Sequence, residues 1–250
     1  MNGASKRTAL VSGAGAPGGI GFAIARQLKN LGYEVLITAT TERIMDRARE
    51  LGVTGAIADL TVESECQELI SRIPKLDVLV NNAGMTSMRS PLGSDEAASL
   101  TEITTAAWER GIKRNLDTAF NLTKAALPKL RNSKSGRIVM ISSVTGGLMA
   151  MAHQPVYAAA KAAMIGLTRA VALDEAKFGI TCNAVLPGWI ATDTQNAHES
   201  AQGAKTPLGR SGTPEEIAGL VSWLISESAG FMTGQALVMD GGNSIVEERN

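Results

Sequence analysis

Short apolar segments and longer segments with helical periodicity alternate along the whole chain. Several of the short segments are apolar at consecutive positions, which is typical of strands buried on both faces of a parallel sheet. We expect strands at residues 8–12, 34–39, 54–58, 77–81, 137–142, 180–186 and 235–240. This alternation predicts an α/β fold of the Rossmann type, a doubly wound parallel seven-stranded sheet with helices on both faces.

Residues that begin or end helices stand at the right places in this pattern. Gly32 follows the first helical segment, and Gly179 follows the longest one. Thr213, Pro214 and Glu216 occupy the N-cap, first and third positions of the last helical segment. They form a capping box, which predicts where that helix begins.

The remaining segments indicate one domain spanning residues 1–250. We find no internal repeat, linker or low-complexity tract. Residues 85–103 lack clear periodicity, so we expect a surface excursion there. Trp108 and Trp223 lie on apolar helical faces, and we expect both in the core.

The composition is that of an ordinary globular protein, with 44% hydrophobic and 19% charged residues. Lysine and arginine together number 24, and so do aspartate and glutamate, so no net charge attracts the chain to nucleic acid or to an anionic membrane. No apolar run approaches the roughly 18 residues of a membrane span, and the N-terminal residues do not resemble a signal peptide. We therefore expect a cytoplasmic protein without a membrane or nucleic-acid partner.

The cysteines and histidines do not indicate a metal site. Cys66 and Cys182 have no C-x-x-C spacing and lie in apolar segments, which predicts small buried thiols. His153 and His198 are far apart and have no companions at metal-ligand spacing.

A glycine-rich stretch, SGAGAPGGIG at residues 12–21, follows the first expected strand and begins the first helix. Glycines in that context let the backbone approach a pyrophosphate, whose charge then faces the free N–H groups of the helix. Two glycine spacings fit, G-x-G-x-x-G at Gly13, Gly15 and Gly18, and G-x-x-x-G-x-G at Gly15, Gly19 and Gly21. The stretch predicts a dinucleotide site and leaves the choice of glycines open.

The end of the second strand indicates which dinucleotide binds. NAD sites commonly carry an acid there, about 20 residues after the loop, for the ribose hydroxyls. Glu34 has that separation but stands at the start of the strand, whereas Thr40 and Arg43 follow its end. Hydroxyls and a guanidinium suit the 2′-phosphate of NADP. The sequence favours NADP, with NAD as the alternative.

Four further motifs follow in order, each beside an expected strand end: NNAG at 81–84, SSV at 142–144, YAAAK at 157–161 and PGWIAT at 187–192. With the glycine loop, they make the chain resemble the short-chain dehydrogenase/reductase family over essentially its whole length. The segments TPLGRSGTPEEIA and TGQALVMDGG are most similar to its beta-ketoacyl-carrier-protein reductase branch.

The resemblance implies the reduction of a ketone, with four catalytic residues. Tyr157 would be the general acid, and Lys161, one helical turn away, would lower the pKa of its phenol and bind the nicotinamide ribose. Ser143 would hydrogen-bond the carbonyl oxygen, while Ser142 would face the core. Asn115 would hold a water beside the lysine; the alternative is a helical asparagine satisfied by backbone groups.

The resemblance also implies the cofactor contacts. The family's loop reads T-G-x-x-x-G-I-G, so its two ends match Gly13 and the run from Gly19, but this chain has Ser12 for threonine and two additional residues in the interval. Asp59 and Leu60 would bracket the adenine, Asn82 would hold the adenosine ribose side, and Ile190 would pack near the carboxamide. The implied set is Gly13, Gly15, Gly19, Ile20, Thr40, Arg43, Asp59, Leu60, Asn82, Tyr157, Lys161 and Ile190.

Two sets of residues concern the substrate. The loop 144–156, the segment 193–206 and Trp189 would wall the pocket, and Met149, Met151 and His153 are candidate lining residues. An acyl carrier protein is acidic, so its reductase should carry basic residues near the pocket. Lys134 and Lys177 stand where the branch places such residues, whereas Phe178 replaces a usual basic one.

Alternatives to a carrier-protein substrate therefore stay open. One is a dehydrogenase of a free alcohol, sugar or hydroxyacid on the same scaffold. Another, of a different class, is a catalytically silent NADP sensor, although such proteins typically lose the tyrosine or the lysine. The family usually assembles as a homotetramer, which we expect here too.

Overall fold

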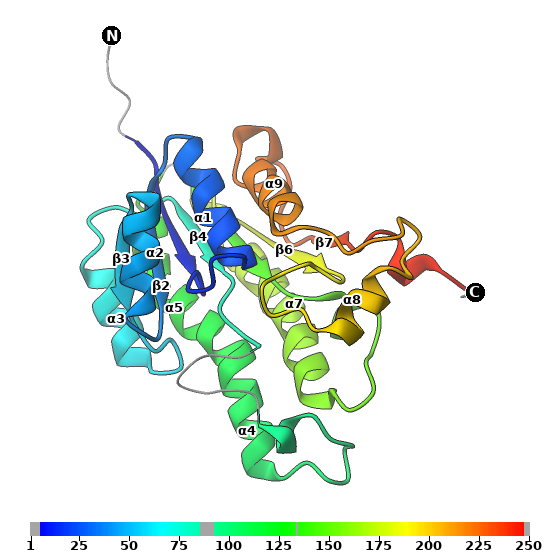
Figure 1. The fold of residues 1–250 in the computed structure, drawn as a ribbon. Helices are drawn as coiled ribbons and strands as arrows, with labels where there is room; N and C mark the ends of the chain where they lie inside the picture. Colours follow the sequence, from blue (N-terminus) through cyan, green and yellow to red (C-terminus); the bar gives the residue numbers. More distant parts are fainter. Residues whose placement is uncertain (1–5, 86–92, 134, 248–250) are drawn as a thin grey trace.

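One parallel sheet organises the protein. The computed structural model describes residues 6–85, 93–133 and 135–247. The sheet has seven strands in the order β3-β2-β1-β4-β5-β6-β7 (Figure 1). They are β1 (Thr8–Ser12), β2 (Glu34–Ala39), β3 (Thr54–Ile57), β4 (Val78–Asn81), β5 (Arg137–Ile141), β6 (Thr181–Pro187) and β7 (Ala236–Met239). The predicted fold is confirmed, and each strand bound lies within one residue of the expected one.

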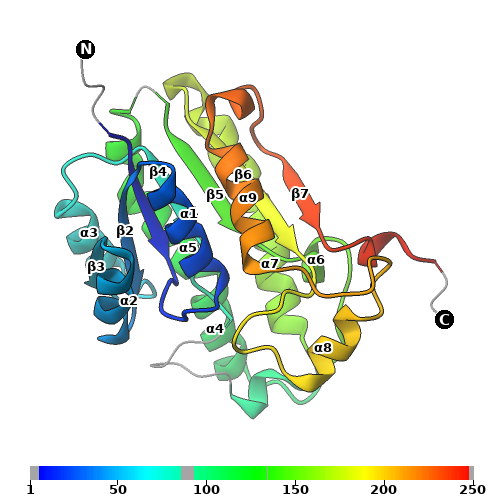
Figure 2. The same ribbon diagram turned by 45° about the horizontal axis from the view of Figure 1, so that its top comes forward.

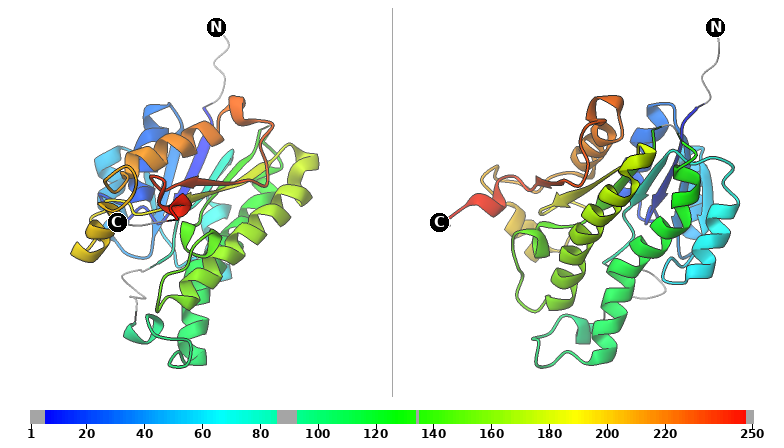
Figure 3. Two further views of the ribbon diagram at one scale, coloured as in Figure 1. Left: turned by 90° about the vertical axis from the view of Figure 1, so that its right-hand side faces the viewer. Right: turned by 180° about the vertical axis from the view of Figure 1, so that it is seen from behind.

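Helices cover both faces of this sheet, with α1, α2 and α9 on one face and α3, α5 and α7 on the other (Figures 2 and 3). Figure 1 shows α4 and α8 beyond the ends of the strands that lie away from the N-terminus. The α-helices are α1 (Ile20–Asn30), α2 (Arg43–Leu51), α3 (Glu63–Ser71), α4 (Thr105–Ile112), α5 (Thr118–Leu130), α6 (Val144–Gly147), α7 (Pro155–Glu175), α8 (Ala197–Gly203) and α9 (Pro214–Leu224). A π-helical turn, η2 (Lys113–Asp117), joins α4 to α5, and the 3₁₀ turns are η1 (Ser94–Glu96), η3 (Ala176–Phe178), η4 (Glu227–Ala229) and η5 (Asn243–Ile245).

The core consists of two apolar layers, one on each face of the sheet. Alternate strand residues point to opposite faces, so Leu10 packs with α3 and α5, whereas its neighbours Ala9 and Val11 pack with α1 and α9. Both cysteines are buried free thiols in the first of these layers, as predicted. Strands that are apolar at consecutive positions are therefore explained by burial on both faces.

The predicted helix ends are confirmed. Gly32 and Gly179 have φ values of 87° and 72°, the left-handed conformation that ends a helix. Thr213 and Glu216 form the capping box at the start of α9.

The prediction for the two tryptophans is wrong, since Trp108 is 38% exposed and Trp223 is 41% exposed. The buried positions of α9 are Ile217, Val221 and Leu224, and residue 223 lies about 100° around the helix from its neighbour at 224. An apolar residue beside an apolar stripe is easily mistaken for part of it.

One helix, Pro155–Phe178, is long and apolar enough to cross a membrane by length and composition alone. In this fold it is a core helix, because Met164, Ile165 and Ala172 are buried between it and the sheet.

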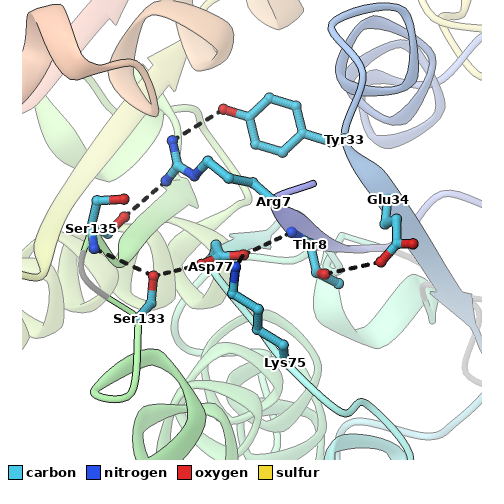
Figure 4. A network of polar contacts seen from close by, with 8 residues as sticks. All are labelled: Arg7, Thr8, Tyr33, Glu34, Lys75, Asp77, Ser133 and Ser135. Atoms are coloured by element: carbon cyan, nitrogen blue, oxygen red, sulfur yellow. Dashed lines mark hydrogen bonds and ion pairs between the residues drawn. The ribbon is translucent and has the colours of Figure 1, made fainter. Parts of the chain in front are cut away.

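A polar network joins β1, β2 and β4 at the amino ends of these strands (Figure 4). The buried carboxylate of Asp77 accepts hydrogen bonds from the Thr8 amide and the Ser133 hydroxyl, and pairs with Lys75. Burial alone would raise the pKa of Asp77, but these partners lower it below its ordinary value. The network fixes β1 against β4 at the amino ends of the strands, opposite the predicted site at their carboxyl ends.

Candidate active site

A cavity of ≈1100 Å³ lies at the carboxyl ends of the strands, where doubly wound sheets bind ligands. Almost every residue that the sequence assigned to the site lines it: Gly13, Gly15, Gly19, Ile20, Thr40, Arg43, Asp59, Leu60, Asn82, Ser143, Tyr157, Lys161 and Ile190. Asn115 does not line the cavity. Residues from all parts of the chain therefore converge on one site.

The glycine loop between β1 and α1 forms one wall. Gly13 has φ 69° and its amide donates to the Thr38 carbonyl at 2.9 Å. A Cβ at Gly21 would lie 2.5 Å from the Asn82 side-chain nitrogen, so a side chain there would push α1 away from β4. These two glycines are required by backbone shape and close approach, respectively.

The amides of this loop divide into two groups. Gly19 donates to the Ala16 carbonyl at 3.1 Å, and Gly18 donates to the Asp193 carboxylate at 2.6 Å. Among the described residues, the amides of Gly15 and Ala16 form no hydrogen bond, and Ile20 begins the helix. The amides open to a ligand are thus those of Gly15, Ala16 and Ile20, all of which line the cavity.

The end of β2 supplies hydroxyls and a cation to the same cavity. Thr40, Thr41 and Arg43 line it, and the Arg43 side chain is exposed. No carboxylate among the described residues forms an ion pair with Arg43. A free guanidinium at this point is suited to a phosphate.

Two polar side chains assigned to the cofactor also stabilise the cavity floor. The Asn82 side chain donates to the carbonyls of Ser12 and Gly13, which joins the ends of β1 and β4. The Asp59 carboxylate accepts from the amide and the hydroxyl of Thr61, which fixes the turn after β3. Both positions are therefore rigid before any ligand binds.

Ser143 and Tyr157 lie together at the other end of the cavity. Ser143 is the N-cap of α6, and its hydroxyl accepts from the Thr145 amide at 3.1 Å. The same hydroxyl lies near enough to the Tyr157 phenol to lower the pKa of that phenol. Ser142 points elsewhere, since its hydroxyl donates to the Lys161 carbonyl at 2.8 Å. The hydroxyls of the two adjacent serines thus have different partners.

Lys161 is buried beneath the phenol, with 4% of its surface exposed. Its ammonium nitrogen donates to the Ile141 carbonyl at 2.8 Å and lies 5.7 Å from the centre of the Tyr157 ring. Burial lowers the pKa of Lys161 to about 8. The side chain is therefore positioned by β5 and close to losing its charge at physiological pH.

The net direction of the Tyr157 pKa is opposite to the expected one in this structure. Burial raises the pKa of Tyr157, and the hydrogen bond with Ser143 opposes that rise. The Lys161 ammonium donates its hydrogen bond to the Ile141 carbonyl and not to the phenol oxygen, so burial determines the direction. Tyr157 is consequently a protonated phenol, the form that donates a proton.

Asn115 lies in the π-helical turn η2 and is satisfied by backbone groups. Its side-chain oxygen accepts from the Met85 amide at 2.5 Å, and its side-chain nitrogen donates to the Gly111 carbonyl at 3.0 Å. This is the alternative that the sequence left open. A Cβ at Gly84 would lie 3.2 Å from the Asn115 oxygen and 3.5 Å from the Lys161 nitrogen, so Asn115 and Lys161 flank the same backbone segment.

The substrate end of the cavity is only partly as expected. Met149, Met151 and Trp189 line it, but His153 does not; it is exposed and has φ 60°. The segment 193–206 lines the cavity, as the sequence predicts, through four polar residues that the sequence analysis did not single out: Gln195, His198, Glu199 and Gln202. The spacing of His198, Glu199 and Gln202 is the available signal, because residues three and four apart lie on one face of α8, whereas Gln195 precedes this helix.

Comparison with known proteins identifies the scaffold. A family model described as enoyl-(acyl carrier protein) reductase matches residues 13–244. The 3-oxoacyl-[acyl-carrier-protein] reductase FabG of Rickettsia felis is 38% identical, covering 96% of this chain and 98% of the relative. The FabG of Escherichia coli is 37% identical, with 96% and 98% covered.

The chain belongs to the short-chain dehydrogenase/reductase family.

The solved structure of Thermoplasma acidophilum aldohexose dehydrogenase, in ligand-free form, has a TM-score of 0.84 and 30% identity and covers 96% of this chain and 95% of that one. Together with the FabG relatives it shows that this short-chain dehydrogenase/reductase is an oxidoreductase that acts on CH–OH or C=O groups. The printed names of these proteins refer to different substrates. The substrate therefore has to be inferred from the site of this member.

Of the two basic residues expected near the pocket for carrier-protein docking, the structure describes one, Lys177. Lys134 lies outside the described residues. The Arg131 guanidinium lies 4.6 Å from the centre of the Phe178 ring, and the Lys177 ammonium lies 5.3 Å from it. Two cations thus surround the phenylalanine that replaces the usual basic residue.

Proposed function

We propose that the protein reduces a ketone of the 3-oxoacyl type to an alcohol, with NADPH as hydride donor and Tyr157 as general acid. The observation that carries this proposal is that Ser143 and Tyr157 line the same cavity, with the buried Lys161 beneath the phenol. Two hydroxyls this close can both donate to one oxygen, the geometry that a carbonyl becoming an alkoxide requires.

The cofactor site fits NADP. The open amides of Gly15, Ala16 and Ile20 would bind the pyrophosphate at the start of α1. Thr40 and Arg43 would bind the 2′-phosphate, while Asp59, Leu60 and Asn82 lie where the adenosine would extend. NAD is the alternative, and it is disfavoured because Glu42, the carboxylate that follows β2, does not line the cavity.

The chain's own residues move one proton in each turnover. When bound, the cofactor supplies a hydride to the carbonyl carbon. Tyr157 donates its phenolic proton to the carbonyl oxygen as that bond forms, and Ser143 hydrogen-bonds the same oxygen. Lys161 then stabilises the phenolate until solvent reprotonates it, and it also binds the nicotinamide ribose.

The substrate is proposed to be an acyl thioester, with acyl carrier protein as a possible carrier. The FabG relatives support this choice, and Met149, Met151 and Trp189 supply apolar surface for an acyl chain. The second candidate is a dehydrogenase of a free sugar, alcohol or hydroxyacid. The polar wall at Gln195, His198, Glu199 and Gln202 favours that candidate, because hydroxyl-rich substrates need such partners.

A substrate comparison distinguishes the two candidates. We expect faster NADPH oxidation with acetoacetyl thioesters than with free ketones, and little NADP⁺ reduction with aldohexoses. Efficient oxidation of an aldohexose without thioester reduction would favour the second candidate. Tight NADPH binding without turnover of any substrate would indicate a sensor.

The quaternary structure and cellular location are proposed from the family resemblance. We propose a cytoplasmic homotetramer. Val238 on the edge strand β7 is 41% exposed, and Phe231 and Ile245 near it are fully or largely exposed. Apolar side chains on an unpaired strand edge are suited to burial against a second copy. Light scattering would measure the mass of the assembly.

Replacing Arg43 with glutamate should change the cofactor preference. The variant loses a charge-assisted contact to the 2′-phosphate and gains repulsion, so the ratio of kcat/KM for NADPH over NADH should fall by about 100-fold. Arg49→Glu, on the same helix but outside the cavity, is the matched control and should keep the wild-type ratio. An unchanged ratio for Arg43→Glu would show that the 2′-phosphate is bound elsewhere.

The affinity for NADPH should depend on pH through Lys161. Its pKa of about 8 in the ligand-free protein means that its charge is lost as pH rises through that value. The dissociation constant should therefore increase between pH 7 and pH 9, by up to about tenfold if the charged form alone binds. Fluorescence titration measures this, and Lys161→Met should show a flat profile. A flat wild-type profile would contradict the role of the ammonium group.

A further inference from the structure

The glycine loop is joined across the cavity mouth to the segment that follows β6. The Gly18 amide donates to the Asp193 carboxylate at 2.6 Å, and these residues are 175 positions apart in the sequence. In Figure 2 the loop between β1 and α1 lies beside the segment after β6. Gly18 belongs to the interval between Gly13 and Gly19, which is two residues longer here than in the family's pattern.

Gly18 is required for this contact. A Cβ at this position would lie 1.9 Å from an Asp193 carboxylate oxygen and 2.5 Å from its carbon. The carboxylate therefore rests against the glycine backbone, in the space that any side chain would fill. The lengthened loop and the aspartate fit each other.

The contact bridges two walls of the cofactor cavity at its rim. Gly15 and Gly19 line one wall, and Ile190 and Asp193 line the other, whereas Gly18 does not face the cavity. Asp193 thus accepts from the Gly18 amide, which is not one of the amides open to a pyrophosphate. The bridge does not occupy the proposed cofactor position but lies across the opening to it.

The bridged segment is fixed on both sides of Asp193. Before it, the Ala191 amide donates to the Gly212 carbonyl at 2.8 Å. After it, Asn196 and Glu199 form the capping box of α8. Asp193 adds a third attachment, to the wall that would hold the pyrophosphate.

We propose that Asp193 is a positioning residue that fastens the segment after β6 over the bound cofactor and slows its release. This rests on the proposed NADP site. The Gly18–Asp193 contact must open before a dinucleotide leaves, because it crosses the rim between the two walls. Loops that close over a ligand often set the rate at which it leaves.

The dissociation rate of NADPH tests this proposal directly. A fluorescence chase with excess NADP⁺ should show roughly tenfold faster release from Asp193→Ala, the lower end of the effect of losing one hydrogen bond to a charged group. Asp193→Asn keeps an acceptor oxygen and should lie closer to the wild type. Gly18→Ala should match Asp193→Ala, and the double variant should be no faster than either single one, because both remove the same contact.

Two controls show that the effect belongs to this contact. Gly219→Ala, at an open position on α9, and Asp174→Ala, at an exposed position late in α7, repeat the chemical changes elsewhere. Both should release NADPH at the wild-type rate, and thermal melting should show all variants folded.

Other outcomes would overturn the proposal. Unchanged release from Asp193→Ala and Gly18→Ala would show that the contact does not retain the cofactor. Slower release would show that the carboxylate opposes the pyrophosphate. Failure of the folded wild-type protein to bind any nicotinamide dinucleotide would refute the proposed function itself, an outcome distinct from the other two.

Discussion

Tyr157→Phe should reduce the rate of ketone reduction by roughly 10²–10⁴-fold and leave NADPH binding nearly unchanged. The substitution removes the one proton that the proposed reaction takes from the protein and keeps the ring that packs in the cavity. Because burial keeps the phenol protonated, its loss should be felt at every pH at which the wild type is active. Single-turnover NADPH oxidation measures the rate, and fluorescence titration measures the binding.

The chain contains one other tyrosine, which provides a matched control. Tyr33 accepts a hydrogen bond from Arg7 at the amino ends of the strands, away from the cavity (Figure 4). Tyr33→Phe makes the same chemical change there and should leave turnover unaffected. Full activity of Tyr157→Phe would remove Tyr157 as the acid.

Lys161→Ala should weaken NADPH binding by roughly 10–100-fold and also slow turnover. The affinity loss corresponds to one hydrogen bond from a charged group to the ribose. The rate loss follows because the phenolate formed after proton transfer would lack its neighbouring cation. Both parameters should change, which distinguishes this variant from Tyr157→Phe.

The control for the lysine is Lys124→Ala, on the surface of α5, where the side chain pairs with Glu63. It should preserve both affinity and rate. Since Lys161 also donates to the Ile141 carbonyl, thermal melting must accompany the measurement. A folded Lys161→Ala protein with a reduced rate but unchanged affinity would contradict the ribose contact.

The sequence was sufficient for the parts of the fold that depend on local pattern. Strands such as 137–142 are apolar at consecutive positions because both faces of the sheet are covered, and Gly32 ends a helix because it adopts φ 87°. Trp108 and Trp223 were misplaced because they neighbour the buried stripe of their helices without belonging to it.

The site was predictable where a motif carries it, and less so where partners are distant in sequence. Tyr157, Lys161 and Ser143 were found from spacing and resemblance. The direction of the Tyr157 pKa is not predictable from the motif, because it depends mainly on how deeply the phenol is buried. No local pattern could pair Gly18 with Asp193. The two residues are 175 positions apart and meet only when the fold brings the segment after β6 beside the glycine loop.

A crystal structure with NADP⁺ and a 3-oxoacyl thioester tests the central claim most directly. The Tyr157 phenol oxygen and the Ser143 hydroxyl oxygen should both lie within hydrogen-bonding distance of the substrate's carbonyl oxygen, with the nicotinamide facing the carbonyl carbon. A carbonyl oxygen bound by other groups, with the phenol directed away from it, would contradict the assignment of Tyr157 as the proton donor.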